Sequence, residues 1–430
     1  MSGIRNLSLA FALVFATLVA AAATQAQEPK DSKYTEDAEK FLGLAMIQQD
    51  PAQREQMYRD ALEALQGGFE EDAENPKFWL TAGQVYAGLG DIEKASEAFN
   101  KATEMHPPYE EEIEGDLEAA WMAGFERGVA MMDRQSYDSA LVVLDAANAL
   151  YPNRPEGWLN IGSIYANNKN DIEKAVHAFE MAMAAVEGPL YEQIDSASQA
   201  QWQDYAEMSA VNIAQMRGVQ GVTEFEAERF EQAEEMFRAA VELNPYSRDY
   251  LFNIVQSQYA QTTDLEEQLE ADSTVEAELG PQLIPLYEEL RAEIEKVKTF
   301  DPNNEALYMI EARALRRENE LKGDTLAAQQ GAMAVLEAHQ ALPVDVDQVS
   351  IVPDPEGASA EITGQVRTRS AAPGSQVTIR VTLLDRHGET IGRQDFSVTV
   401  PEADQTAPFG GTAPAEGSIA GWKYEVVAAD

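Results

Sequence analysis

Nine residues occur twice in nearly the same form, as DIEKASEAF at 91–99 and as DIEKAVHAF at 171–179. Seven of the nine positions are identical, although the two copies begin 80 residues apart. Internal repetition of this kind is typical of architectures in which one supersecondary unit stacks on the next. The repeat therefore restricts the fold of this chain more strongly than its composition does.

Each copy belongs to a longer unit with small and aromatic residues at fixed offsets. In residues 76–107 the turn contains Gly90, which ends a first helix, and Asp91, which caps a second. The same offsets recur in 155–189, and more weakly in 121–154 and 214–247. The marker residues of the first unit are Trp79, Gly83, Tyr86, Gly90, Ala95, Phe99, Ala102 and Pro107.

These offsets resemble the tetratricopeptide repeat, a helix–turn–helix unit of about 34 residues. The resemblance implies an all-α, right-handed helical solenoid over residues 27–343, with an inner groove lined by the first helix of each unit. Further helix pairs are expected at 34–65 and 304–341, and the acidic stretch 264–279 is expected to be a loop or a frayed helix. An irregular helical bundle is the alternative fold.

The apolar period changes near residue 345. Alternating stretches such as SQVTIRVTLLD and GWKYEVVA, separated by turns, predict strands. We expect five to seven strands in a small β-sandwich over residues 344–430, with Trp422 or Tyr424 as a core anchor. Residues 401–417 are interpreted as a loop because they are rich in proline and glycine.

The stretch VTLLDRHGETI resembles the FxLYD-type β-sandwich modules of bacterial envelope proteins. Val381, Leu383, Asp385 and Gly388 carry this resemblance, whereas Val381 and Leu384 replace the aromatic residues of the pattern. The chain is thus similar to a tetratricopeptide repeat protein of the bacterial envelope with an FxLYD-like domain at its C-terminus.

The first residues have the pattern of a secretory signal peptide. Arg5 precedes an apolar run from Leu7 to Ala23, and small residues follow. We expect cleavage after Ala26, with 21–23 as an alternative cleavage region, and an uncleaved membrane anchor as the alternative outcome. An exported protein in the periplasm or associated with the envelope is predicted. It is not expected to be lipidated, because the chain has no cysteine to carry a lipid.

The formal net charge of -44 restricts the class of partner. A surface this acidic argues against nucleic acid, because phosphates require cationic side chains. It indicates either a solvated, self-repelling surface, which would also suit a saline habitat, or the attraction of a basic protein.

Signs of catalysis or metal binding are weak. The four histidines, His106, His177, His339 and His387, do not have the spacing of metal ligands. The sequence also lacks the phosphate-binding and nucleophile motifs of common enzymes. We therefore predict no catalytic residue, no cofactor, no metal site and no enzymatic activity.

The leading hypothesis is an exported scaffold that binds a protein or peptide in the groove of the solenoid. One alternative is an envelope enzyme or carbohydrate-handling module with its site in the β-domain or in 261–284, and another is a self-assembling structural element. Some groove positions could instead pack against an elongated inserted helix. The predicted groove residues are Lys77, Leu80, Gln84, Met122, Phe125, Val129, Met132, Leu159, Ser163 and Asn167.

Overall fold

The computed structural model describes residues 29–428, apart from 272–273, 275 and 355–357. The chain forms two compact units that divide between Glu207 and Met208, inside helix α12 (Ser196–Glu226), and each unit is described by itself. The predicted signal peptide, 1–26, lies outside the described residues. None of the helices described here has the length and apolar character needed to cross a membrane.

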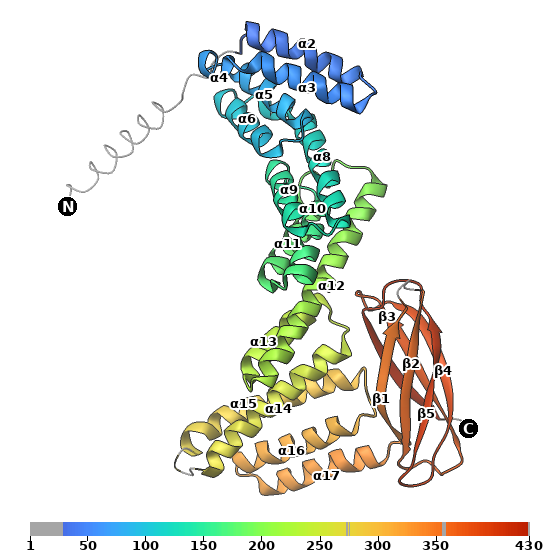
Figure 1. The fold of residues 1–430 in the computed structure, drawn as a ribbon. Helices are drawn as coiled ribbons and strands as arrows, with labels where there is room; N and C mark the ends of the chain where they lie inside the picture. Colours follow the sequence, from blue (N-terminus) through green and yellow to red (C-terminus); the bar gives the residue numbers. More distant parts are fainter. Residues whose placement is uncertain (1–28, 272–273, 275, 355–357, 429–430) are drawn as a thin grey trace, which may run out of the picture. The chain divides into compact units, whose positions relative to one another are not determined.

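The first unit consists of antiparallel helix pairs that follow one another along the chain (Figure 1). Its helices, with the N-terminal part of α12, are α2 (Lys33–Ile47), α3 (Pro51–Leu65), α4 (Gly68–Glu71), α5 (Pro76–Gly88), α6 (Ile92–Met105), α7 (Tyr109–Glu112), α8 (Glu114–Asp133), α9 (Tyr137–Leu150), α10 (Pro155–Ile164) and α11 (Ile172–Ala184). The predicted caps are present, since the Asp91 and Asp171 side chains accept from the backbone N–H of Lys94 and Lys174. The predicted helical solenoid is confirmed.

The repeated small residues bring the two helices of each pair together. A Cβ atom on Gly83 would lie 2.6 Å from the ring of Phe99, and one on Gly162 would lie 2.7 Å from the ring of Phe179. Both rings are buried in the interface between the paired helices. Glycine at this offset is therefore required by the aromatic residue of the following helix.

The longer turn of the 155–189 unit is built in a way that its sequence did not indicate. This turn has one residue more than the turn of the 76–107 unit, and α10 continues into a π-helical turn over Tyr165–Lys169. Asn170 then closes the turn in the left-handed conformation, with a φ of 54°. The insertion is thus accommodated by widening the end of the helix.

The second unit continues the helical pairs and then adds strands. Its helices are the C-terminal part of α12, α13 (Phe230–Leu243), α14 (Arg248–Ala271), α15 (Glu276–Lys298), α16 (Glu305–Leu321) and α17 (Thr325–Gln340). Of the two forms expected for 264–279, the loop is wrong for most of this stretch, since 264–271 belong to α14 and 276–279 to α15. Its helical form is stabilised because Leu265 and Leu269 pack against the core of this unit.

The strands form two three-stranded antiparallel sheets, with orders β1-β2-β5 and β4-β3-β6. Inward-facing side chains from both sheets, including Trp422 and Tyr424, form one apolar core. The strands are β1 (Val344–Pro353), β2 (Ser359–Thr368), β3 (Gln376–Leu384), β4 (Thr390–Thr399), β5 (Thr406–Pro414) and β6 (Gly421–Ala428). Both predicted core anchors are thus confirmed.

Strand β5 corrects the interpretation of 401–417 as a loop. It pairs with β2 along its whole length, from Thr406 opposite Arg367 to Pro414 opposite Ser359. Pro408 is tolerated because β5 lies at the edge of its sheet, where a missing backbone N–H costs no ladder bond. Phe409 of this strand is buried in the sandwich core.

Residues Phe300–Asn304, between α15 and α16, lie against one strand of each sheet. The Tyr424 N–H of β6 donates to the Phe300 carbonyl at 3.1 Å, and the Val346 N–H of β1 donates to the Asn303 carbonyl at 3.4 Å. The Asn303 side chain donates to the Val344 carbonyl at 2.7 Å. This loop therefore covers exposed backbone groups on two sheet edges.

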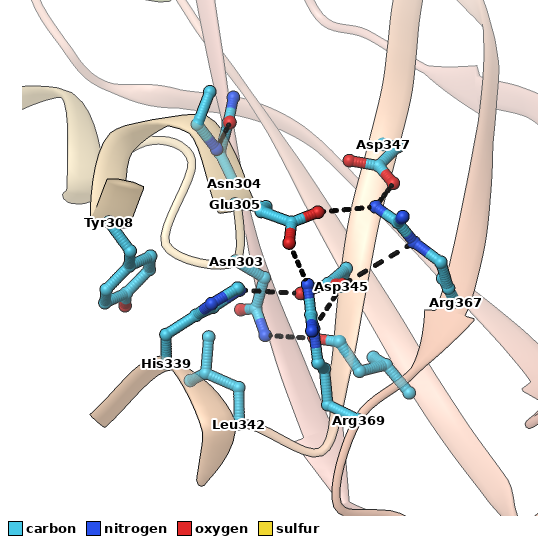
Figure 2. A network of polar contacts seen from close by, with 12 residues as sticks. Asn303, Asn304, Glu305, Tyr308, His339, Leu342, Asp345, Asp347, Arg367 and Arg369 are labelled. Carbon is cyan, nitrogen blue, oxygen red and sulfur yellow. Dashed lines mark hydrogen bonds and ion pairs between the residues drawn. The ribbon is translucent and has the colours of Figure 1, made fainter. Parts of the chain in front are cut away.

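Charged side chains reinforce the contact between the helices and the strands (Figure 2). Asp345 of β1 is fully buried and is surrounded by three cationic or potentially cationic groups, His339, Arg367 and Arg369. Its carboxylate contacts His339 Nε2 at 2.9 Å and accepts from Arg369 Nε at 2.5 Å. Arg367 and Arg369 both pair with Glu305 at the start of α16. The last helices and the sandwich are consequently joined by a polar network as well as by the loop.

Candidate functional site

The accessible part of the predicted groove lies on α8. Met122, Phe125, Val129 and Met132 follow one another at intervals of three and four residues, so they share one face of the helix. Met122 is 39% exposed, and the other three are half-buried. An apolar stripe that solvent can reach is thus present on a first helix of the solenoid.

Helix α10 and the turn after it carry the next part of the groove set. Leu159 and Ser163 are half-buried, and Asn167 is exposed. The Ser163 hydroxyl donates to the Leu159 carbonyl at 2.8 Å. The surface is therefore aliphatic at Leu159 and polar at Asn167.

Acidic residues accompany the apolar stripe of α8. By helical spacing, Glu118, Glu126 and Asp133 lie on the same face as Met122 and Val129, and Glu126 and Asp133 are exposed. Glu118 is paired with Arg154 at 2.9 Å, and Arg154 also pairs with Glu156 at 2.9 Å. The face therefore combines apolar contacts with a negative potential.

The predicted groove residues on α5 are engaged with their own chain. Lys77 pairs with Asp31 and with Glu39, and the hydrogen bond to Asp31 raises the pKa of its ammonium group. Leu80 is only 6% exposed, because it lies in the cluster that contains Tyr109 of α7. An inserted helix thus covers this end of the groove, which was the alternative foreseen for some of these positions.

Gln84 is held in a similar way. Its side-chain amide donates to Asp116, at the start of α8, at 2.7 Å. The residues before 121 therefore fill the space in front of α5. The predicted groove residues that stay at least partly exposed to solvent are Met122, Phe125, Val129, Met132, Leu159, Ser163 and Asn167.

An aromatic cluster borders the stripe at its N-terminal end, and sequence reasoning missed it. Trp121 is 1% exposed and stacks on Phe125 with ring centroids 5.0 Å apart. Its indole N–H donates to Asn148 at 3.0 Å, and the Arg154 guanidinium lies 4.4 Å from its ring. The two tryptophans of this region, at 121 and 202, are the sequence signal that could have indicated the cluster.

Trp202 of α12 also lies near Arg154, with its ring 5.8 Å from the guanidinium, and is 2% exposed. Tyr191 contacts Trp202 with ring centroids 6.4 Å apart, and Leu190 packs against the cluster of Trp121, Ala147 and Tyr151. The insertion between α11 and α12 therefore reaches the same aromatic cluster that borders the apolar stripe.

Among the described residues of the alternative site, 261–284, Glu266 is a buried carboxylate. It accepts hydrogen bonds from Tyr287, from Arg317 at 2.8 Å and from Arg313 at 2.5 Å. Burial acts to raise the pKa of Glu266, but these hydrogen bonds outweigh it and hold the pKa below the usual 4.5. Because Glu266 has hydrogen-bond partners within its own chain for both carboxylate oxygens, we interpret its role as structural. In the described part of the chain, no three acidic or histidine side chains are grouped as metal ligands.

Comparison with known proteins identifies the repeat. Residues 52–114 match the family model of the tetratricopeptide repeat. The matched segment runs from α3 to the first residue of α8, and the tetratricopeptide repeat thus describes the part of the solenoid that precedes the apolar stripe. A search of the curated proteins gave no significant match.

Solved structures match parts of this chain at low identity and low TM-score. The MamA protein of Desulfovibrio magneticus is 17% identical over 49% of this chain and 96% of its own, with a TM-score of 0.20. A tetratricopeptide repeat protein of Bacteroides fragilis is 13% identical over 61% of this chain and 99% of its own, with a TM-score of 0.24. At such identities and TM-scores, the likeness says nothing about function.

Proposed function

We propose that the protein is a non-enzymatic scaffold that binds a segment of a partner protein on the stripe formed by Met122, Phe125, Val129 and Met132. The single observation that supports this is an apolar stripe, accessible to solvent, on a first helix of a tetratricopeptide-like solenoid. Methionine side chains adapt to different apolar contacts, and an amphipathic helix is a common ligand for such a face.

The partner segment is proposed to be basic. Glu126 and Asp133 are exposed on the same helix face, and the chain as a whole carries a net charge of -44. Attraction of this kind is screened beyond about 8 Å at physiological ionic strength. Binding should therefore weaken as salt is raised, and an affinity that does not change with salt would contradict a basic partner.

A photo-cross-linking amino acid at position 122 of the full chain tests the proposed site. We expect a defined cross-linked partner from the native cells, and we expect the Met132→Glu variant to lose it because a carboxylate would enter the apolar stripe. Position 142 is the matched control, since Val142 is 69% exposed but lies on α9, a second helix. Equal cross-linking from both positions would reject the stripe as the binding surface.

Export to the envelope is also part of the proposal, and the sequence of residues 1–26 supports it. The mature protein should begin at Gln27 and should be found in the periplasmic or envelope fraction. In this proposal the sandwich, with its FxLYD-like segment, provides a second contact or an attachment to the envelope. A protein that keeps Met1 and stays in the cytoplasmic fraction would reject export.

A further inference from the structure

We infer that residues Gly188–Asp195, here called the strap, are an internal ligand that occupies the end of the binding face and is displaced when a partner binds. This inference rests on the proposed function and adds a regulatory element to the same site. It follows from where the strap lies, how it is held, and what its side chains contact.

The strap lies on the aromatic cluster that continues the binding face. Leu190 packs against the cluster of Trp121, Ala147 and Tyr151, and Phe125 borders the same cluster while stacking on Trp121. Tyr191 contacts the ring of Trp202. One residue of the proposed binding stripe, Phe125, thus shares its apolar surroundings with a side chain of the strap.

The strap is held weakly in comparison with the helices on either side. Its backbone consists of turns. Its hydrogen bonds lie within the strap, such as Tyr191 N–H to the Gly188 carbonyl at 3.2 Å, or join it to the start of α12, where Asp195 accepts from the Ala197 N–H at 2.9 Å. Gln199 of α12 donates to the Tyr191 carbonyl at 2.8 Å. Leu190 and Tyr191 are only half-buried, whereas Trp121 and Trp202 are almost completely buried. The two tryptophans are therefore part of the buried core, whereas the strap is a half-buried segment that can leave the cluster at small cost.

The side chains of the strap indicate what replaces it. Leu190 is an aliphatic residue followed by an aromatic one, and both contact apolar surfaces. A partner that presents an aliphatic anchor next to the α8 stripe would take the place of Leu190. Because the strap is attached to the chain, it competes at an effective concentration on the order of millimolar.

A peptide with the sequence of residues 186–196, labelled with fluorescein, tests the inference by fluorescence anisotropy. It should bind the full-length Leu190→Ser, Tyr191→Ser double variant about tenfold more tightly than the wild-type chain, whose own strap competes for the site. A peptide that carries Leu190→Ser should not bind either chain. Equal affinity for the wild type and the double variant, or no binding to both, would overturn the inference.

A matched control and a second variant guard against misfolding. Ile194→Ser changes a half-buried residue of the strap outside the Trp121 cluster, and it should behave like the wild type. Leu190→Ala is a milder change and should give the same direction of effect as the double variant. A gain in peptide binding with Ile194→Ser as large as with the double variant would also overturn the inference.

The two proposals can fail separately. If a cross-linked partner is found at position 122 but the strap peptide does not discriminate between the chains, the scaffold function stands and the strap is only structural. If the peptide discriminates but no partner is cross-linked, the strap is an internal ligand and the proposed function fails. When both hold, the partner should bind the double variant about tenfold more tightly than the wild type.

Discussion

At the scale of single residues, the stacking of the helices depends on positions where no side chain fits. Gly83 faces the ring of Phe99, and the equivalent glycines at 128, 162 and 221 face Leu144, Phe179 and Phe237. Each glycine is matched by a large residue of the second helix in the same unit. The spacing of these glycines in the sequence was enough to predict the helix pairs, because the constraint is local.

Gly83→Ala should destabilise the first unit by about 1–3 kcal/mol, because the new methyl group would displace the buried Phe99 ring. Urea denaturation followed by circular dichroism measures this change. Gly43→Ala is the matched control, since Gly43 is also in a helix but has nothing within 4 Å of an added Cβ. The control should stabilise the protein by up to about 1 kcal/mol, and a loss of the same size as for Gly83→Ala would contradict close packing.

The buried carboxylate of Glu266 should make the folded protein less stable as the pH is lowered. Its pKa is held below the usual 4.5 in the folded protein, so its ionised form contributes stability above about pH 4.5. That contribution is lost as the pH falls through the lower folded pKa. Glu266→Gln should cost about 3–5 kcal/mol at neutral pH, because Arg313 and Arg317 lose their shared anion.

The free energy of unfolding of the wild type and of the Glu266→Gln variant is measured between pH 7 and pH 3. The difference between wild type and Glu266→Gln should shrink as the pH is lowered. Asp395→Asn, which breaks a pair with Arg380 on the exposed face of the sandwich, is the control and should have a much smaller effect. A difference that stays constant over this range would show that the charge of Glu266 is not what stabilises the site.

At the scale of elements, helices and strands with a periodic apolar pattern could be predicted from the sequence. Elements that depend on contacts between residues far apart in the chain could not. The helix pairs and strands β2, β3, β4 and β6 follow from periodicity. Strand β5 was missed because Pro408 and its neighbouring glycines look like a loop until β2 pairs with them. The position of Leu190 on Trp121 was missed for the same reason, since no local pattern specifies which cluster an insertion reaches.

The loop Phe300–Asn304 provides a test at this scale. The Tyr424 hydroxyl donates to Asp301 at 2.7 Å and accepts from the Asn303 N–H at 3.1 Å, and Tyr424 is buried. Tyr424→Phe removes one hydrogen bond from the Asp301 carboxylate and one from the Asn303 N–H. It should lower the free energy of unfolding by about 1–3 kcal/mol. An unchanged stability, measured by thermal denaturation, would show that the hydroxyl does not hold the loop.

At the scale of the whole molecule, the two compact units define where the chain can be divided. The second unit contains both the last helix pairs and the sandwich. A fragment of residues 208–430 should therefore fold with a cooperative thermal transition, whereas a fragment of 344–430 should be unstable or aggregate. If the shorter fragment were monomeric and as stable as the longer one, the helices would not be needed by the sandwich.

The net charge of -44 also acts on the molecule as a whole. Like charges at this density repel one another more strongly in the compact state than in the unfolded chain. Raising the salt from about 0.01 M to about 0.1 M shortens the screening length from about 30 Å to about 10 Å and should raise the melting temperature. Sodium chloride and potassium chloride should act alike, and a melting temperature independent of both salts would contradict self-repulsion.

The backbone contacts of Phe300 and Asn303 with β6 and β1 have a consequence for how such a domain can be inherited or transplanted. A sandwich whose open strands are closed by its neighbour has no need to carry its own protection against pairing with another chain. If the sandwich were moved alone onto a different protein, two strand edges with unpaired backbone groups would be free to pair with another chain. The unit that can be exchanged safely is therefore the strands together with the turn that seals them.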